Sequence, residues 1–482
     1  MSAIKRVVVV GRDAAFWLSL LALRRALEPA GIVVEGVELP SQLDPADCYA
    51  AVPTLTGLHH QLGLDRRDVL RAADGLPTQG QRFSAWGVGP FVHGYDGPRA
   101  AINNIDILQF WIAGRINGLA MPYEELSVAS VAARQGRVGN DDRDPATFGT
   151  CHRGYNLDAR AYVAALAQLA RTQRGVIASG SCLEVERQGD EVSAVVVDGQ
   201  RIEADLFVDA TGADALVTCS PFNDWKHWFP ANHLFTASLP KLTPWPAFAD
   251  IRAFAGGWAG LFPLRRRTAV QGACKCGPGG SDELLSSLSQ LLGATPLDVI
   301  VRPFAAGTRS AWSGNVVAIG DSFTHLEPLD AMQLQLIHAG ISNLIAWFPN
   351  ERHAPPEAAS YNAIMARYAA NIRDFMIAHY RFNGRVGEPL WDAARAVTPP
   401  DTLLVKTSLF AARGLTPLND DETFDEGSWS SSLIGHGLVP QGYDPRVDLI
   451  PLPEALEKMQ RLLLRIADEV RGMPTVEGYL AE

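Results

Sequence analysis

NVVAIGDSFTHLEPLDAMQLQLIHAGISNLIAWF, residues 315–348, is the stretch that decides the fold. Its apolar run from Val316 predicts a short buried strand that ends at Gly320. After Pro328 the apolar residues recur at helical spacing until Pro349 closes the pattern. The stretch therefore predicts a strand, a turn and a long helix. Because the first N–H groups of a helix lack intrahelical partners, such a turn favours negative charge. A unit that only packs is the simpler interpretation of an isolated Gly-Asp.

The N-terminus predicts a Rossmann-type β-α-β unit. Residues 4–10 form an uninterrupted apolar strand pattern, Gly11 follows it, and a helical pattern runs to about Leu27. A second strand is expected at residues 32–39. Glu38 lies near the end of that strand, where a dinucleotide-binding fold places the acid that binds ribose hydroxyls. The fold class that follows is α/β.

The phosphate-binding fingerprint is incomplete. A G-x-G-x-x-G loop needs three glycines, and this chain has Gly11, then Asp13 and Phe16. A carboxylate beside a pyrophosphate is repelled by about a few kcal/mol at partly buried distances. Phe16 is expected to push the helix away from the sheet. Conventional FAD binding is therefore not predicted, although the β-α-β fold is.

Two further segments extend this plan. Residues 183–197 predict a hairpin whose turn is at Gly189. Residues 204–212 predict a strand that ends in D-A-T-G, with Asp209 and Gly212 at the two ends of that motif. The motif gains weight from its order, after the β-α-β start and before Gly320.

Composition excludes several classes of protein. The 482 residues include 42 Lys and Arg against 53 Asp and Glu, a formal charge of −11, which argues against a nucleic-acid surface. The six cysteines lack the C-x-x-C spacing of a zinc site, so no metal is expected. No stretch reaches transmembrane length, and the helical pattern at residues 453–471 predicts a docked amphipathic helix. We expect a cytoplasmic protein without a membrane role.

Several segments resemble the flavin-dependent tryptophan halogenases. In that family a strand, a glycine and the run E-P-L-E precede a helix, as they do in residues 315–348, with Asp330 in place of the last glutamate. Residues 361–385 resemble the family's long helix, and residues 424–445 resemble its SW segment. The three residues that match the run are Glu327, Pro328 and Leu329.

The resemblance implies an FAD-dependent monooxygenase or halogenase fold with a substrate-side β-sheet. It implies two domains: residues 1–360, FAD/NAD(P)-binding-like with the interleaved sheet, and residues 361–482, a helical C-terminal subdomain. The residues expected to contact the cofactor are Gly11, Asp13, Glu38, Asp209, Gly212, Gly320, Asp321, Pro328 and Leu329.

The resemblance also locates the reacting groups. The family's lysine, which handles the hypohalous acid, corresponds to Thr78, which carries no cation and cannot form a haloamine. No lysine occurs between Lys5 and Lys226. The family's glutamate corresponds to Asp330, whose carboxylate has a shorter reach. The residues at the halide position are Met332 and Gln333, which are expected to crowd it.

The substrate side of the family is represented by residues 257–264, which resemble its G-W-x-W-x-I-P motif. Gly260 replaces the second tryptophan. The residues implied for the substrate pocket are Trp258, Phe262, Pro263 and Glu327. The aromatic side chains of residues 225–254 could line a pocket for a flat molecule, but burial preference favours a core role.

Two functions follow as hypotheses. The first is a flavin-dependent halogenase or monooxygenase, a flavoprotein oxidoreductase acting on a flat aromatic substrate such as an indole. It would use reduced FAD from a separate flavin reductase, oxygen, and chloride or bromide. The alternative is a catalytically degenerate halogenase-like protein that binds a small ligand or a partner, such as a second copy of itself or an active paralogue.

Overall fold

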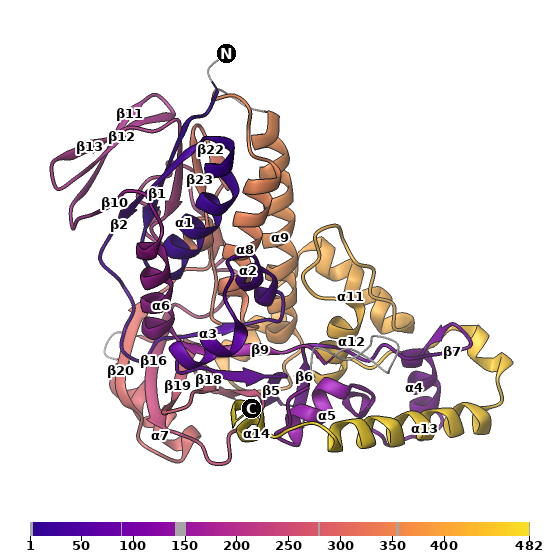
Figure 1. Cartoon of the computed structure of the whole chain (residues 1–482). Coiled ribbons are helices and arrows are strands. Elements are labelled where there is room, and N and C mark those ends of the chain that lie inside the picture. The colour runs from indigo at the N-terminus through magenta and orange to yellow at the C-terminus, as the bar shows by residue number, and fades with distance from the viewer. Residues whose placement is uncertain (1–2, 88, 140–150, 278–279, 353–355, 482) are drawn as a thin grey trace. The chain divides into compact units, whose positions relative to one another are not determined.

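The computed structural model describes residues 3–87, 89–139, 151–277, 280–352 and 356–481 (Figure 1). The chain forms two compact units, each assembled from three segments. Unit 1 comprises Met1–Gly75, Leu157–Lys226 and Arg302–Ala370; unit 2 comprises Leu76–Asn156, His227–Val301 and Asn371–Glu482. The division predicted from the sequence, 1–360 and 361–482, remains a prediction about domains.

Unit 1 is built on a six-stranded, mainly parallel sheet. Its neighbouring strands pair in parallel except for the last two, which are antiparallel. Its central strands are continuous apolar runs because both faces of the sheet are covered. The order is β10 (Ile177–Ser179), β2 (Val33–Glu38), β1 (Arg6–Gly11), β14 (Leu206–Ala210), β23 (Val316–Ala318) and β22 (Trp312–Ser313).

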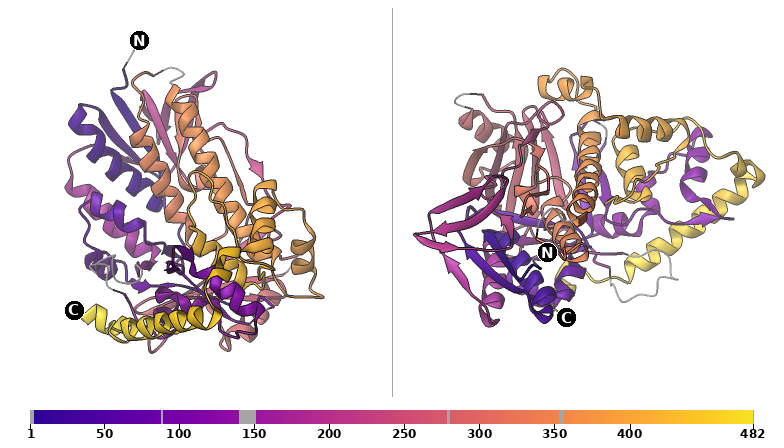
Figure 2. Two further views of the ribbon diagram at one scale, coloured as in Figure 1. Left: turned by 90° about the vertical axis from the view of Figure 1, so that its right-hand side faces the viewer. Right: turned by 90° about the horizontal axis from the view of Figure 1, so that it is seen from above.

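Helices pack on this sheet as the sequence predicts. α1 (Asp13–Leu27) contacts β1, β2, α6 (Ala159–Thr172) and α8 (Met332–Ala346). Figures 1 and 2 show α8 beside the first half of α9 (Pro356–Arg381), where the Tyr361 hydroxyl donates to the carbonyl of Gly340 at 3.1 Å. The predicted β-α-β start, the strand-turn-helix stretch and the α/β fold class are confirmed.

Phe16 does not push α1 away from the sheet, so that expectation was wrong. The side chain is fully buried, and α1 packs on β2. Gly36 on β2 makes the room, because a Cβ added there would lie 3.0 Å from the Phe16 ring. The ring therefore occupies space that a side chain at position 36 would otherwise fill.

A three-stranded meander covers one side of the unit 1 core (Figure 1). It consists of β11 (Leu183–Gln188), β12 (Glu191–Val197) and β13 (Gln200–Ile202). The predicted hairpin is confirmed, with Gly189 at φ 64° in its turn. Val192 and Val195 of the meander are buried in one cluster with Val8 of β1. The remaining elements wholly inside unit 1 are β3 (Cys48–Ala51), α2 (Leu55–Gln61), α3 (Arg66–Ala72), β15 (Asn223–Asp224), β21 (Gly307–Thr308) and β24 (Thr324–His325).

Unit 2 contains a seven-stranded sheet. The pairs β16–β19, β19–β18, β18–β17 and β5–β6 are antiparallel, and the pair β17–β5 is parallel. Phe235 is buried in a cluster on this sheet, which agrees with a core role for that aromatic residue. The order is β20 (Leu297–Pro303), β16 (His233–Pro240), β19 (Arg267–Cys274), β18 (Gly257–Pro263), β17 (Ala249–Phe254), β5 (Gly80–Ser84) and β6 (Phe91–Gly94).

Helices complete unit 2. α13 (Leu452–Arg471) contacts α4 (Ile107–Ile116) and α5 (Val128–Arg134), so the predicted amphipathic helix is docked on its own unit. None of the helices in the described ranges is long and apolar enough to cross a bilayer. The other elements are β4 (Leu76–Thr78), β7 (Ala101–Ile102), β8 (Ile105–Asp106), β9 (Gly154–Asp158), α7 (Ser281–Leu292), α10 (Pro389–Ala396), α11 (Asp401–Arg413), α12 (Glu426–Gly435) and α14 (Val476–Ala481).

The fit of Phe16 against Gly36 predicts a specific loss of stability. Gly36→Ala should lower the free energy of unfolding by about 1–3 kcal/mol, because the new methyl group overpacks against the ring. Gly57→Ala is the matched control. Gly57 lies in α2, and a Cβ added there has no atom within 4 Å, so this substitution should raise the free energy of unfolding by about 0.4–1 kcal/mol. Chemical denaturation measures both. Equal effects at the two positions would contradict the packing argument.

Candidate functional site

The carboxyl ends of the unit 1 strands are where ligands bind in doubly wound sheets. Gly11 ends β1 between Glu38 of β2 and Ala210 of β14. A Cβ at Gly11 would lie 2.3 Å from the Ala210 carbonyl oxygen, so the sheet itself requires glycine there. The close strand packing explains Gly11 without reference to a cofactor.

Asp13 occupies the start of α1. Its backbone is left-handed, with φ 57°, and its carboxylate accepts hydrogen bonds from the Ser41 hydroxyl at 2.5 Å and the Gln42 N–H at 3.2 Å. The Gln42 amide in turn donates to Asp214 at 2.8 Å. The N-terminus of a helix favours a bound anion. Here the carboxylate at that end belongs to Asp13 itself, and it binds Ser41 and Gln42 of the adjacent loop.

The charges around this loop do not fit the pyrophosphate of FAD. Asp13 and Asp214 are both joined to Gln42, while Arg12 lies 3.9 Å from Asp214. Arg302 forms an ion pair with Asp44, and Arg160 donates to the carbonyl of Leu43 in the same loop at 2.6 Å. Two carboxylates in one hydrogen-bonded loop repel a doubly charged group, and Arg12 and Arg302 already have acidic partners.

Glu38 lies where a ribose-binding acid is expected, half-buried at the end of β2. Its carboxylate accepts a hydrogen bond from the Ser179 hydroxyl at 3.2 Å and pairs with Arg171 at 3.5 Å. The position suits the predicted role. The carboxylate is nevertheless also used to join β2 to β10 and α6.

Asp209 is an internal hydrogen-bond acceptor. It is fully buried, and the loop that follows β14 folds around it. Its carboxylate binds five donors: the Thr211 N–H and hydroxyl, the Val217 N–H, the Thr218 N–H and the Ser322 hydroxyl, at 2.7–3.0 Å. Gly212, at φ 85°, donates its N–H to the same Ser322 hydroxyl at 3.1 Å. These contacts tie the D-A-T-G strand to the turn at Gly320.

The turn after β23 is a short 3-10 helix, Gly320–Ser322, that begins at φ 64°. Burial raises the pKa of the Asp321 carboxyl, and the nearby His325 lowers it. A Cβ at Gly320 would lie 3.0 Å from Ile337 of α8, so this glycine lets the turn approach the helix. Gly320 and Asp321 thus lie in unit 1, as the sequence predicts, at the start of the segment that leads to α8.

The segment before α8 is conformationally strained. Asp330 and Ala331 are both left-handed, at φ 58° and 62°, and each such residue costs about 1–3 kcal/mol. Strained non-glycine residues cluster at binding and active sites. The structure brings together in this segment buried Glu327, Leu329, Asp330 and Met332, with Pro328 and Gln333 half-buried.

Thr78, which the sequence predicts to occupy the position of the family lysine, lies in unit 2 on β4. It is fully buried, and its hydroxyl donates to the carbonyl of Gly80 at 3.0 Å, with the carbonyl of Ala247 at 3.3 Å. The side chain is short and its one donor is satisfied by the backbone. Thr78 therefore serves the local strand packing and presents no cation.

Of the four residues implied for the substrate pocket, Trp258, Phe262 and Pro263 lie on β18 in unit 2, whereas Glu327 lies in unit 1. Trp258 is fully buried and its indole N–H donates to the Tyr380 hydroxyl at 3.0 Å. A Cβ at Gly260 would lie 2.6 Å from the Phe262 ring, so Phe262 fills the space beside that glycine. The Pro263 carbonyl accepts from Asn156 at 3.4 Å. The side chains of Trp258 and Phe262 are therefore engaged within unit 2.

Sequence reasoning missed an aromatic and histidine cluster in unit 2. The rings of Phe83 and His379 stack at 4.6 Å, and His379 Nδ1 lies 2.7 Å from His436 Nε2. Burial first, and then the neighbouring histidines, hold the pKa of His436 well below its usual range. Trp86 packs edge-on to Trp391 at 4.8 Å. The sequence signal that could have found this cluster is the pair His379-Tyr380 in residues 361–385 and the triplet Gly435-His436-Gly437 in residues 424–445.

A buried ion pair was also missed. Lys406 lies 2.6 Å from Glu422 and 4.2 Å from the centre of the Trp429 ring. The Trp429 indole N–H donates to the second oxygen of Glu422 at 3.2 Å, and Phe375 stacks on Phe424 at 3.7 Å beside it. A fully paired lysine of this kind orders the SW segment. The ion pair is recognisable only from the folded positions of Lys406, Glu422 and Trp429, so a sequence motif could not predict it.

Known proteins share the whole of this fold. The family model described as tryptophan halogenase matches residues 6–452. Among curated proteins, tryptophan 7-halogenase KtzQ of Kutzneria sp. (strain 744) is 23% identical over 99% of this chain and 98% of its own length.

Among solved structures, BrvH, a flavin-dependent halogenase from Brevundimonas sp. BAL3, is 29% identical with a TM-score of 0.92, covering 99% of both chains. Xcc4156, a flavin-dependent halogenase from Xanthomonas campestris, is 25% identical with a TM-score of 0.92, covering 100% of this chain and 98% of its own. The match spans both units and includes every segment in which the sequence resembles the halogenases. The chain therefore belongs to the tryptophan halogenase family of flavin-dependent halogenases.

Proposed function

We propose that this protein acts in the chemical class of its family, as a flavin-dependent halogenase or monooxygenase on a flat aromatic substrate such as an indole. The observation that carries the proposal is the match of the family model across both units, over residues 6–452. Two similar proteins are a tryptophan 7-halogenase and a tryptophan 6-halogenase by name. Reduced FAD from a separate reductase, oxygen and chloride or bromide would be the co-reactants.

The residue roles follow from the strained segment and from β18. Asp330 is the carboxylate proposed to act in the reaction, beside buried Glu327. Trp258, Phe262 and Pro263 are proposed as the substrate wall. Met332 and Gln333 stand at the halide position.

Bound flavin would supply the oxidising power for halide or substrate. Because the loop at Asp13 does not fit the pyrophosphate, we propose that the flavin is bound weakly and assign no step to it. The remaining predicted cofactor contacts, such as Glu38, would have to hold it without a conventional phosphate loop.

A second candidate, a catalytically degenerate protein that binds a ligand or a partner, rests on the sequence-based assignment of Thr78 to the position of the family lysine. The hydroxyl of Thr78 is buried and bonded to backbone carbonyls, so nothing at this position can form a haloamine or donate from an ammonium group. The departures at Asp13, Phe16, Gly260 and Met332 add to it, since each replaces a residue tied to the family's chemistry.

A halogenation assay distinguishes the two candidates. The purified protein is incubated with FAD, a flavin reductase, bromide and indole, and bromoindole is measured by mass spectrometry. The halogenase proposal expects product above a protein-free control, formed slowly because no lysine handles the hypohalous acid. Asp330→Ala should abolish it, and Asp298→Ala, at an exposed position of unit 2, should not. A folded wild-type protein that forms no bromoindole would reject the halogenase proposal in favour of the second candidate.

The affinity for flavin should increase when the negative charge of Asp13 is removed from the loop. Asp13→Gly removes a carboxylate from the proposed phosphate site and a left-handed backbone penalty, and we expect FAD to bind at least about tenfold more tightly. Asp298→Gly is the matched control, because Asp298 is also left-handed, at φ 53°, but exposed in unit 2. Titration of flavin fluorescence measures both. Wild-type protein that retains one flavin per chain through gel filtration would contradict the weak-binding argument.

A further inference from the structure

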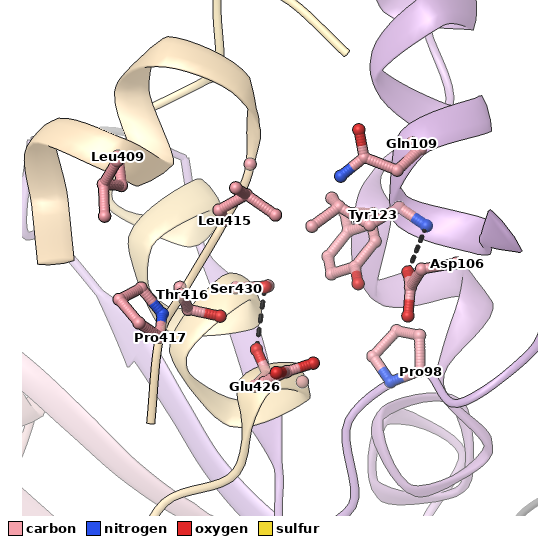
Figure 3. A pocket seen from close by; sticks show the side chains of 13 residues that line it. Pro98, Asp106, Gln109, Tyr123, Leu409, Leu415, Thr416, Pro417, Glu426 and Ser430 are labelled. Carbon is pink, nitrogen blue, oxygen red and sulfur yellow. Dashed lines mark hydrogen bonds between the residues drawn. The ribbon is translucent and has the colours of Figure 1, made fainter. Parts of the chain in front are cut away.

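A cavity in unit 2 lies apart from every residue assigned above (Figure 3). Its volume is about 260 Å³, and one wall comes from the start of α4 and the 3-10 helix Tyr123–Leu126. The other wall comes from the end of α11, the loop after it and the start of α12. The lining residues are Pro98, Asp106, Leu108, Gln109, Tyr123, Leu409, Gly414, Leu415, Thr416, Pro417, Glu426, Gly427 and Ser430.

The cavity lies on a different face of α12 from the aromatic cluster. Glu426 and Ser430 are one helical turn apart and line it, and the Ser430 hydroxyl donates to the Glu426 carbonyl at 2.7 Å. Trp429 and His436 project from the same stretch of chain toward Phe375 and Phe83. None of these aromatic rings is among the residues that line the cavity, so the cavity is separate from the aromatic cluster.

Two carboxylates give the cavity its charge. Asp106 caps α4 by accepting the Leu108 N–H at 2.7 Å, and Glu426 begins α12. Desolvation by the surrounding protein raises the pKa of Asp106, the Leu108 N–H opposes this, and the charge of Glu426 raises it further. No lysine, arginine or histidine is among the lining residues. The nearby Arg99 is paired with Asp425 at 2.7 Å.

Two hydroxyl groups point into the same space without a partner in the chain. Tyr123 is 4% exposed and Thr416 is 5% exposed, yet neither hydroxyl has a hydrogen bond among the described residues. Figure 3 shows the Tyr123 hydroxyl directed toward the space beside Asp106, and Thr416 facing it from the opposite wall. Both residues line the cavity, so their hydroxyl groups can bond a ligand that occupies it.

We propose that this cavity binds a small organic ammonium ion carried on an apolar body. The two carboxylates balance the positive charge, the hydroxyl groups accept N–H donors, and Leu108, Leu409 and Leu415 contact the apolar part. The carboxylates, the hydroxyl groups and the leucine side chains thus each have a matching group in such a ligand. A carboxylate on the ligand, as in an amino acid, is repelled by Asp106 and Glu426.

The cavity size restricts the ligand. A cavity of about 260 Å³ accommodates a ligand the size of a single-ring amine. Bare metal ions are a poorer match, because the described residues contain no group of three metal-ligating side chains. This proposal does not depend on flavin binding or on halogenation.

The probe for the test is 2-phenylethylamine, compared by calorimetry with 2-phenylethanol, its neutral analogue, and with phenylalanine, which adds a carboxylate. Wild-type protein near neutral pH should bind the amine at least about tenfold more tightly than either of the others. Equal affinity for the amine and the alcohol, or no detectable binding of the amine, would overturn the proposal. A short lysine-containing peptide tests whether the ammonium group comes from a partner protein, and tighter binding of that peptide would support the same recognition chemistry.

Variants test the assigned groups. Asp106→Asn, which keeps a helix-capping side chain, and Glu426→Gln should each weaken amine binding by about three- to tenfold and leave the weak alcohol binding unchanged. The controls are Asp468→Asn and Glu457→Gln, exposed carboxylates of α13 in the same unit. Tyr123→Phe should weaken binding of both probes, because the hydroxyl bonds either. Amine affinity that is unchanged in both carboxylate variants, with thermal stability intact, would refute the site.

Discussion

The hydrogen bonds to the Asp209 carboxylate are the interactions on which the carboxyl end of the unit 1 sheet depends. It is removed from water and accepts five hydrogen bonds, four from residues 211–218 of the following loop and one from the distant Ser322. An unpaired buried carboxylate would be costly, so the loop after β14 and the turn at Ser322 can only close where they satisfy it. This fixes the distance between the D-A-T-G strand and the segment that leads into α8. The strained pair Asp330 and Ala331 is therefore presented from a rigid base.

Three positions that the sequence predicts to lie at the cofactor, the lysine site and the substrate wall make their contacts within the chain. Asp13 is bonded to Ser41 and Gln42, the Thr78 hydroxyl to backbone carbonyls, and the space beside Gly260 is filled by Phe262. At each of these three positions, the atoms that could contact a ligand contact neighbouring residues of the chain instead. Such internal bonding stabilises the fold and, at the same sites, competes with any cofactor or substrate.

The sequence predicted the parts of the fold that depend on local pattern. The buried strands at Val316 and at the N-terminus are continuous apolar runs, and the helices have clear periodicity and glycine or proline ends. The accommodation of Phe16 was not predictable, because it depends on Gly36 across the helix–sheet interface. The role of Asp209 as an internal acceptor depends on donors up to 113 residues away. The cluster of Phe83, His379 and His436 likewise joins three distant segments, none of which carries the signal alone.

The pairing of Phe16 with Gly36 also bears on how this loop can change over time. Returning Phe16 alone to glycine would empty a fully buried ring site, a loss of about 3–5 kcal/mol for a change of this size. Refilling that void from position 36 requires a second substitution, which is itself harmful while the ring is present. A smaller residue at position 16 leaves a void and a larger residue at position 36 overpacks, so these two positions can exchange volume without loss of stability only if both change together.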